Sequence, residues 1–251
     1  MLNELQKCTI QAIINVFETG SPSGDYANIT VAPGDPGHLT YGRSQTTLAS
    51  GNLALLVRSY CDSPGAIHAV ELGAYLVRLH ARDCTLDSDA RFRSLLCEAA
   101  ADAAMRRVQD DFFDRAYWHP AVHAADALTI ESPLGTAVVY DSFIHGAWAR
   151  LRDATLARIG SPSAASERTW VRAYISLRRD WLANHPNPLL RRAIYRMDTF
   201  LALDAASNWD LTLPLLAHGV TITQASLSAR QGTSSAAEVP SSMAMRPPVP
   251  G

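Results

Sequence analysis

The sequence is almost without lysine, and it carries no surplus of charge of either sign. Lys7 is the single lysine among 251 residues, and the 22 basic and 24 acidic residues leave a formal net charge of −2. Such a balance provides no basic field for nucleic acid or for an anionic membrane surface. We therefore expect neither nucleic acid nor a membrane as a partner.

Long apolar runs and a secretory leader are also missing from the sequence. No stretch approaches the roughly 18 apolar residues that a membrane-spanning helix requires. Residues 1–20 lack the basic start, apolar block and small-residue cleavage site of a signal peptide. With 47% hydrophobic and 18% charged residues, the chain nevertheless has ample material for a core.

Cysteine is scarce, and its spacing predicts no metal site. The four cysteines are Cys8, Cys61, Cys84 and Cys97, with no C-x-x-C pair among them. Cys8 and Cys97 look like small buried apolar residues, and the sequence leaves the disulfide state open.

Two histidines have the spacing of a metal pair but lack its other parts. His119 and His123 are four residues apart, but no glutamate adjoins them and Pro120 lies between them. We expect core or surface histidines here, no metal, and no cofactor.

The hydrophobic pattern is helical along most of the chain. Apolar residues over 2–17 recur at steps of three and four, and the Gly-, Ser- and Pro-rich segment 20–24 ends this first helix. Ser63-Pro64 and Ser132-Pro133 have the sequence of helix starts. Further helices are predicted over residues 52–61, 63–80, 90–116, 119–128, 133–150, 166–183 and 187–203.

One short β element interrupts the helices near residues 25–45. The β-type runs 26–31 and 38–41 flank the turn sequence 33–37, and no other segment favours a strand. From residue 223 onward Ala, Ser, Pro and Gln dominate, which is typical of disorder. The pattern predicts a mainly α (α+β) domain over residues 1–222 and a disordered tail over 223–251.

Two carboxylates in different surroundings form the candidate catalytic pair. Glu18 follows Val16 and Phe17 at the end of an apolar helix, where partial burial disfavours the ionised form of a carboxyl group. Asp35 lies in a Gly- and Pro-rich turn, where a solvated carboxylate stays ionised. Glycoside hydrolysis requires such an acid and base. The pattern also fits a structural interpretation, in which Glu18 caps a helix and Asp35 makes a turn.

Short motifs accompany this pair in a definite order along the chain. They lie at residues 34–40, 114–122, 139–146, 177–179, 195–199 and 208–215. In this order and at these spacings they resemble the chitosanases of glycoside hydrolase family 46, which belong to the lysozyme-like superfamily. The resemblance implies a lysozyme-like fold with two lobes, a cleft between them, and a small β segment near residues 25–45.

The resemblance also implies catalytic roles. Glu18 would be the general acid, Asp35 the general base, and Thr40 the residue that positions the attacking water. The family's wide separation of acid and base leaves room for that water, so inversion at the anomeric carbon is expected. The implied activity is endo-hydrolysis of β-1,4-linked amino-sugar polymers, chitosan above all.

Behind the acid, the family pattern has an aspartate between two arginines, matched here by Asp141, Arg178 and Arg196. A buried arginine would hold the carboxyl group in place, and the aspartate would offset the arginine's charge through shared hydrogen bonds. The same three residues also fit a purely structural ion-pair cluster.

The candidate substrate-binding residues follow the catalytic turn, and here the sequence departs from the family. Arg43 and Gln45 belong to the hydrogen-bonding run 41–47, which fits a sugar-binding wall or an ordinary loop before a helix, and His38 only loosely matches the family's basic residue. Asn52 replaces a cleft aspartate.

Val31 and Ala32 stand where the family has acidic residues. An amide and two apolar residues suit a neutral N-acetylated sugar better than an ammonium group. Peptidoglycan hydrolysis is therefore the alternative function, and a non-catalytic glycan-binding module a further one. We expect action outside the cytoplasm, reached by phage lysis or a specialised secretion device, and the oligomeric state stays open.

Overall fold

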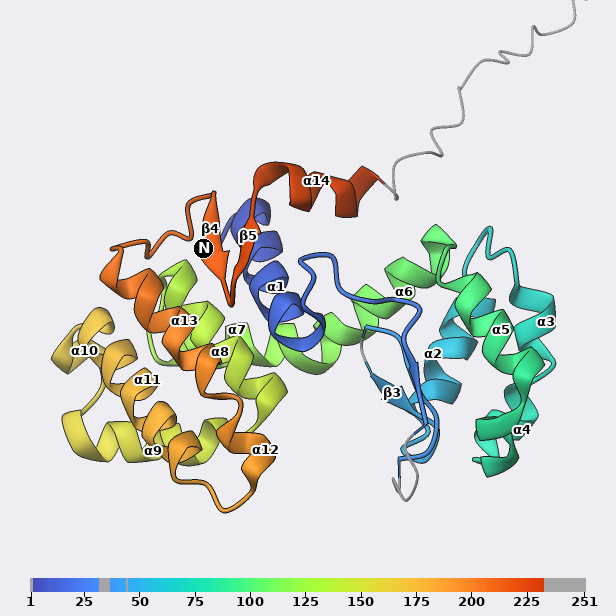
Figure 1. Cartoon of the computed structure of the whole chain (residues 1–251), viewed down its shortest axis with the longest axis horizontal. Helices are drawn as coiled ribbons and strands as arrows, with labels where there is room; N and C mark the ends of the chain where they lie inside the picture. Colours follow the sequence, from blue (N-terminus) through green and yellow to red (C-terminus); the bar gives the residue numbers. More distant parts are fainter. Residues whose placement is uncertain (1, 32–36, 44, 233–251) are drawn as a thin grey trace, which may run out of the picture.

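The computed structural model describes residues 2–31, 37–43 and 45–232, and in these residues the helices form two lobes (Figure 1). Each lobe has its own hydrophobic core. The mainly helical, two-lobed architecture with one small sheet near residues 25–45 is confirmed.

The large lobe is built around helix α1 (Glu4–Thr19), whose residues from Cys8 to Phe17 are buried. A capping box starts this helix: Gln6 N donates to Asn3 Oδ1 at 2.8 Å, and Asn3 N donates to Gln6 Oε1 at 3.0 Å. Gly20, with φ of +73°, ends it in the left-handed conformation. Glu18 therefore lies in the last turn, as the sequence predicts.

The remaining elements of the large lobe come from the second half of the chain. They are α7 (His119–Ala127), α8 (Pro133–His145), α9 (Trp148–Ile159), α10 (Pro162–Ala165), α11 (Glu167–Ala183), α12 (Pro188–Arg191), α13 (Ile194–Ala205), and the hairpin of β4 (Leu215–Ala217) and β5 (Val220–Ile222). Helix α8 is apolar nearly all round, and α1, α7, α11 and α13 pack against it.

The small lobe is continuous in sequence and carries the three-stranded antiparallel sheet. Its elements are β1 (Ile29–Thr30), β2 (Thr40–Tyr41), β3 (Thr46–Thr47), α2 (Asn52–Cys61), α3 (Ala69–Gly73), α4 (Leu76–His80), a 3-10 turn η1 (Cys84–Ser88) and α5 (Ala90–Ala99). Strand β2 lies in the middle, so Thr40 pairs with Thr30 on one side and Thr47 on the other.

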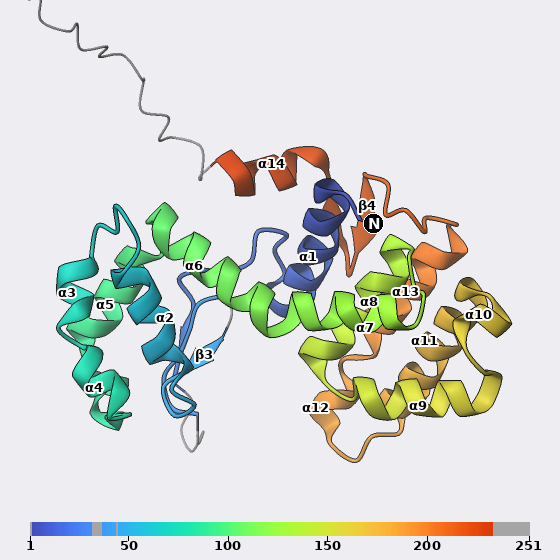
Figure 2. The same ribbon diagram turned by 180° about the vertical axis from the view of Figure 1, so that it is seen from behind.

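Helix α6 (Ala103–Phe113) connects the lobes and belongs to both of them (Figures 1 and 2). Met105 and Val108 lie in the core of the small lobe, whereas Phe113 lies in the core of the large lobe. A π-helical turn η2 (Asp114–Trp118) then leads into α7, where Pro120 has no N–H to continue a regular ladder.

The prediction of one helix over 63–80 is wrong. Residues 62–68 form turns, and the helices α3 and α4 follow. Gly65 has a φ of +76°, which a helix does not allow, and the N–H of Ile67 donates to Asp102 Oδ2 at 2.9 Å. Ser63-Pro64 is therefore not a helix start.

Three other predicted helices are interrupted. Asp102 caps a new helix by accepting from Ala104 N at 2.8 Å, which divides 90–116 into α5 and α6. Positive φ angles at Gly146 and Ala147 divide 133–150, and α9, most of which the sequence did not predict, begins there. The helix expected over 187–203 consists of α12 and α13.

The C-terminal region contains structure that the sequence did not predict. Strands β4 and β5 meet at His218 and Gly219, which both have positive φ, as in a tight hairpin. Residues 224–232, expected within the disordered tail, form α14 (Gln224–Gly232), and Leu227 is buried. The folded region therefore continues past residue 222, and residues 233–251 lie outside the described residues.

All four cysteines are free. Cys8 is buried as predicted, but Cys97 is exposed, because the buried face of α5 consists of Phe92, Leu95, Leu96 and Ala99. Among the residues described, no helix is long and apolar enough to cross a membrane.

Candidate active site

The Glu18 carboxylate is bound by an arginine from the far end of the chain. Arg196, on α13, donates from Nη2 to Glu18 Oε1 at 2.6 Å. The Glu18 side chain keeps 29% of its surface exposed, whereas Arg196 is buried. The Tyr195 hydroxyl also donates to the carbonyl of Phe17 at 2.8 Å, so α13 fixes the last turn of α1 at two points.

Asp141, on α8, is fully buried on the other side of the same guanidinium. Its Oδ1 accepts from Arg196 Nη1 at 2.8 Å. Burial opposes the charge of Arg196, but the carboxylates of Asp141 and Glu18 outweigh it and hold the pKa of Arg196 above its ordinary value. Arg196 therefore stays charged and links an exposed carboxylate to a buried one.

Arg178, on α11, is fully buried and lies farther from Asp141 than the sequence interpretation required. Its Nη2 is 3.9 Å from Asp141 Oδ2, a distance of ionic attraction without a hydrogen bond. Arg178 Nη1 instead donates to the carbonyl of Gly146 at 2.7 Å. The expectation of shared hydrogen bonds from both arginines is therefore wrong for Arg178, which also anchors the end of α8.

His145 completes this cluster one helical turn after Asp141. Its Nδ1 accepts from Arg178 Nη2 at 3.3 Å, so the neutral ring carries its proton on Nε2. Burial and the neighbouring charge of Arg196 lower the pKa of His145. The site therefore contains an uncharged hydrogen-bond donor that the sequence analysis did not assign.

A hollow of about 140 Å³ opens beside the Glu18 carboxyl group. Both lobes and the connecting helix contribute to its walls. It is lined by Glu18, Arg43, Gln45, Phe113, Tyr117, Ile144 and His145. An exposed carboxyl group held by a charged arginine beside an aromatic-lined hollow can present a proton to a bound sugar.

The two other predicted catalytic residues come from the small lobe. Thr40 lies half-buried in the middle strand, and its hydroxyl is 3.4 Å from the carbonyl of His38. Asp35 lies outside the described residues, as does Ala32. The predicted roles of Asp35 and Thr40 stay predictions.

The predicted substrate-binding residues are only partly brought together. Arg43 and Gln45 line the Glu18 hollow. His38 does not line it, and its Nδ1 is bound to Asp87 Oδ2 at 2.8 Å. Asn52 is exposed in the first turn of α2.

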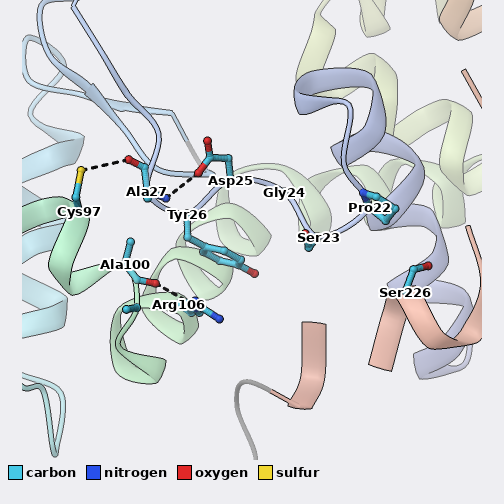
Figure 3. Close-up of a pocket in the computed structure, with 11 residues that line it drawn as sticks. Pro22, Ser23, Gly24, Asp25, Tyr26, Ala27, Cys97, Ala100, Arg106 and Ser226 are labelled. Carbon is cyan, nitrogen blue, oxygen red and sulfur yellow. Dashed lines mark hydrogen bonds between the residues drawn. The ribbon is translucent and has the colours of Figure 1, made fainter. Parts of the chain in front are cut away.

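A larger hollow, of about 590 Å³, lies elsewhere, between the 22–27 loop, the corner between α5 and α6, and α14 (Figure 3). Its two charged side chains, Arg106 and Asp25, are both hydrogen-bonded to the backbone. Arg106 Nε donates to Ala100 O at 2.8 Å, and Asp25 Oδ1 accepts from Ala27 N at 3.0 Å. Glu18 does not line it, so size alone does not locate the active site.

No group of three or more His, Cys, Asp or Glu among the described residues could hold a metal ion. His119 and His123 are both exposed on α7.

Sequence reasoning missed several residues that form the walls of the hollow. His145 is four residues after Asp141 and thus on the same face of α8, a signal that was available. Phe113 precedes the π-helical turn and Tyr117 lies within it, and no sequence signal places that turn beside Glu18.

Comparisons with known proteins point to one family. The model of glycosyl hydrolase family 46 matches residues 12–215. A curated chitosanase from Bacillus subtilis (strain 168) is 27% identical over 232 residues, covering 85% of this chain and 82% of the relative.

Solved structures of two chitosanases have the same fold. A mutant enzyme from Bacillus subtilis MY002, complexed with 6 GlcN, has a TM-score of 0.72 at 24% identity, covering 89% of this chain and 100% of that one. A Gynuella sunshinyii family 46 chitosanase in complex with chitotetraose has a TM-score of 0.71 at 25% identity, with 89% and 99% covered. The family match spans both lobes and includes Glu18, Asp141 and Arg196, and the chain belongs to glycosyl hydrolase family 46.

Proposed function

We propose that this glycoside hydrolase is an endo-acting, inverting chitosanase in which Glu18 is the general acid. The observation that carries the proposal is the chain of contacts from Glu18 through Arg196 to the buried Asp141, at the edge of an aromatic-lined hollow. In a family 46 chain, such a carboxyl group is the natural proton donor to the glycosidic oxygen.

The contacts of Glu18 suit that task. An arginine alone would favour the ionised carboxylate and oppose proton donation. Because Asp141 binds the other side of the same guanidinium, some of the arginine's charge is already neutralised. Arg196 can then orient Glu18 while its own charge is shared between two carboxylates.

Residues of the small lobe activate the attacking water. In our proposal the Asp35 carboxylate takes a proton from a water that Thr40 orients, and the water attacks the anomeric carbon from the face opposite the leaving group. The proton of Glu18 goes to the leaving oxygen, so the product forms with inverted configuration. Asp141, Arg178 and Arg196 hold the acid in place.

Chitosan is the substrate that the relatives support. The curated relative from Bacillus subtilis is a chitosanase, and the two solved structures hold 6 GlcN and chitotetraose. Neither peptidoglycan hydrolysis nor a non-catalytic module has a counterpart among them. We also propose that the protein meets this polysaccharide outside the cytoplasm.

Counting reducing ends tests the substrate. The protein is incubated with chitosan, with N-acetylated chitin oligomers and with peptidoglycan sacculi, and we expect release from chitosan above the other two. Activity on sacculi without activity on chitosan would contradict the proposal. Proton NMR of the first-formed product anomer tests inversion, and a retained anomer would overturn it.

Glu18→Gln tests the acid, and Glu4→Gln is its matched control at the opposite end of the same helix. We expect Glu18→Gln to lower turnover by about 10²–10⁴-fold while the fold persists. Glu4, in the first turn of α1, does not line the hollow, and its variant should retain full turnover. Equal activity of the two variants would remove Glu18 from the mechanism.

A further inference from the structure

Arg43 does not present its guanidinium to solvent as a substrate-binding residue would. Its side chain is only 2% exposed, and its charge is already used inside the protein. Nη1 is ion-paired with Asp110 of α6, and the guanidinium stacks 4.9 Å from the ring centre of Phe113. Sugar binding by Arg43 stays a prediction, and its internal contacts indicate a further role.

The contacts of Arg43 cross from one lobe to the other. Arg43 follows strand β2, three residues after Thr40, and so belongs to the small lobe. Its Nε donates to Oδ1 of the buried Asn15 on α1 at 3.1 Å. Asn15 lies three residues before Glu18, about one helical turn, so a single hydrogen bond joins the strand of Thr40 to the helix of Glu18.

The backbone beside Arg43 is fixed to the connecting helix as well. The N–H of Arg43 donates to Oε1 of the fully buried Gln109 on α6 at 2.9 Å. Gln109 Nε2 in turn donates to the carbonyl of Tyr26 at 3.0 Å, and the Tyr26 hydroxyl donates to Asp110 at 2.9 Å.

The contacts of Arg43 with Asn15, Gln109, Asp110 and Phe113, which we call the Arg43 junction, are closely packed. A Cβ on Gly42 would lie 2.3 Å from Gln109 Oε1, and one on Gly24 would lie 3.3 Å from both Arg43 and Asn15. Gly24 belongs to the 22–27 loop that lines the larger hollow of Figure 3. The Arg43 junction therefore lies where that loop, α1, α6 and the β2–β3 turn meet.

We infer that Arg43 is a positioning residue, which fixes the small lobe's catalytic strand relative to the helix of Glu18 through Asn15 and Asp110. The inference rests on the proposed function, because it deepens the role of the same site. An inverting hydrolase needs its acid and its water-binding residues at a set separation, and misplacement by about 1 Å can cost roughly 10²-fold in rate. Arg43 sets that separation without touching the reacting atoms.

The test replaces Arg43 by Met, which keeps the apolar stem and removes every guanidinium contact. We expect kcat on the glucosamine hexamer to fall about 10- to 100-fold, with KM changed by less than about threefold. Circular dichroism at the assay temperature confirms that the variant is folded. Arg43→Lys, which keeps a cation facing Asp110, should recover some of the lost kcat.

Arg78→Met is the matched control. Arg78 has the same kinds of contact as Arg43, through Nε to Asp83 at 2.8 Å and Nη1 to Asp89 at 2.7 Å, and it stacks near Tyr75 at 5.8 Å. All of these residues lie in the small lobe, so the control loses an arginine without loosening the junction. Its kcat should equal that of the unmodified chain.

A distance measurement separates this inference from the proposed function. Spin labels at Glu71→Cys on α3 and Ala164→Cys on α10, both exposed, report the separation of the lobes once the exposed and half-buried native cysteines are changed to serine. Arg43→Met should broaden the distance distribution, and Arg78→Met should not. If the protein proves inactive on chitosan, the distances still test the junction.

Two results would overturn the inference: normal kcat in folded Arg43→Met, or a distance distribution as narrow as in the unmodified chain. If Arg43→Met does not fold, Asn15→Ala removes the same hydrogen bond from the side of α1. That variant must then show the lowered kcat and the broadened distribution, and normal values for both would equally overturn the inference.

Discussion

Arg196 donates a hydrogen bond of 2.6 Å to the exposed carboxylate of Glu18. Its second terminal nitrogen binds Asp141, which solvent does not reach. The exposed Glu18 carboxylate is therefore held by a hydrogen-bonded network that is anchored in the buried core of the large lobe.

This burial predicts a large stability cost for Asp141→Asn. Removing the charge leaves Arg196 and Arg178 buried with an uncompensated positive charge, so the free energy of unfolding should fall by about 3–5 kcal/mol. Asp198→Asn is the control, because Asp198 forms an exposed ion pair with Arg179, with 50% and 41% of the side chains accessible. That variant should lose less than about 1 kcal/mol. Urea unfolding measures both, and equal losses would contradict the prediction.

Thr40→Ala should lower kcat by a smaller factor than the about 10²–10⁴-fold expected for Glu18→Gln, because a hydroxyl that orients water transfers no proton in the mechanism. Thr47→Ala is its control, since Thr47 pairs with Thr40 from the neighbouring strand. Steady-state kinetics on the glucosamine hexamer would show whether the effect belongs to Thr40 alone. A similar loss in both variants would assign it to the sheet.

The lowered pKa of His145 predicts that the folded protein loses stability as the pH becomes acidic. Burial and the charge of Arg196 lower the pKa of this imidazole in the folded protein from its ordinary value of 6.5. Below pH 6.5 the unfolded chain therefore binds a proton that the folded chain does not, and stability falls as the pH drops. His145→Asn should reduce the change in melting temperature between pH 7.5 and pH 5, whereas the exposed His123→Asn should not. An unchanged pH profile in His145→Asn would refute the assignment.

Gly42→Ala should destabilise the protein far more than Gly20→Ala. Both glycines have a φ near +72°, so each substitution has the left-handed strain of about 1–2 kcal/mol. Only at Gly42 does the added methyl overlap Gln109, while nothing lies within 4 Å at Gly20. We expect a loss of about 3 kcal/mol or more at Gly42, measured by calorimetry. Equal losses would mean that the turn moves away from α6 freely.

Much of the helical fold could be predicted from local sequence. Helix α2 has the predicted bounds of residues 52–61, and α11 differs from its prediction by one residue. In both, apolar residues at helical spacing form the buried face. The helix break at Ala147 could not be predicted, because alanine favours a helix and its φ of +68° is imposed by tertiary packing.

Some residues of the site could likewise be predicted from local sequence, and others could not. Glu18 could be placed because a helix end is a local property. The burial of Arg43 could not, because an arginine in a polar turn looks like a surface residue until Asn15, Asp110 and Phe113 close around it. Those partners come from distant regions of the chain, and no local pattern brings them together.

The order of elements along the chain has a consequence for biosynthesis. The apolar face of α1, from Cys8 to Phe17, is covered by α8, β4 and β5, and these emerge from the ribosome only after the whole small lobe. The small lobe, by contrast, has its core residues from Leu39 to Val108 in one uninterrupted stretch. On a nascent chain the small lobe can therefore collapse early, while α1 keeps its face uncovered, and open to chaperones, until translation is nearly complete.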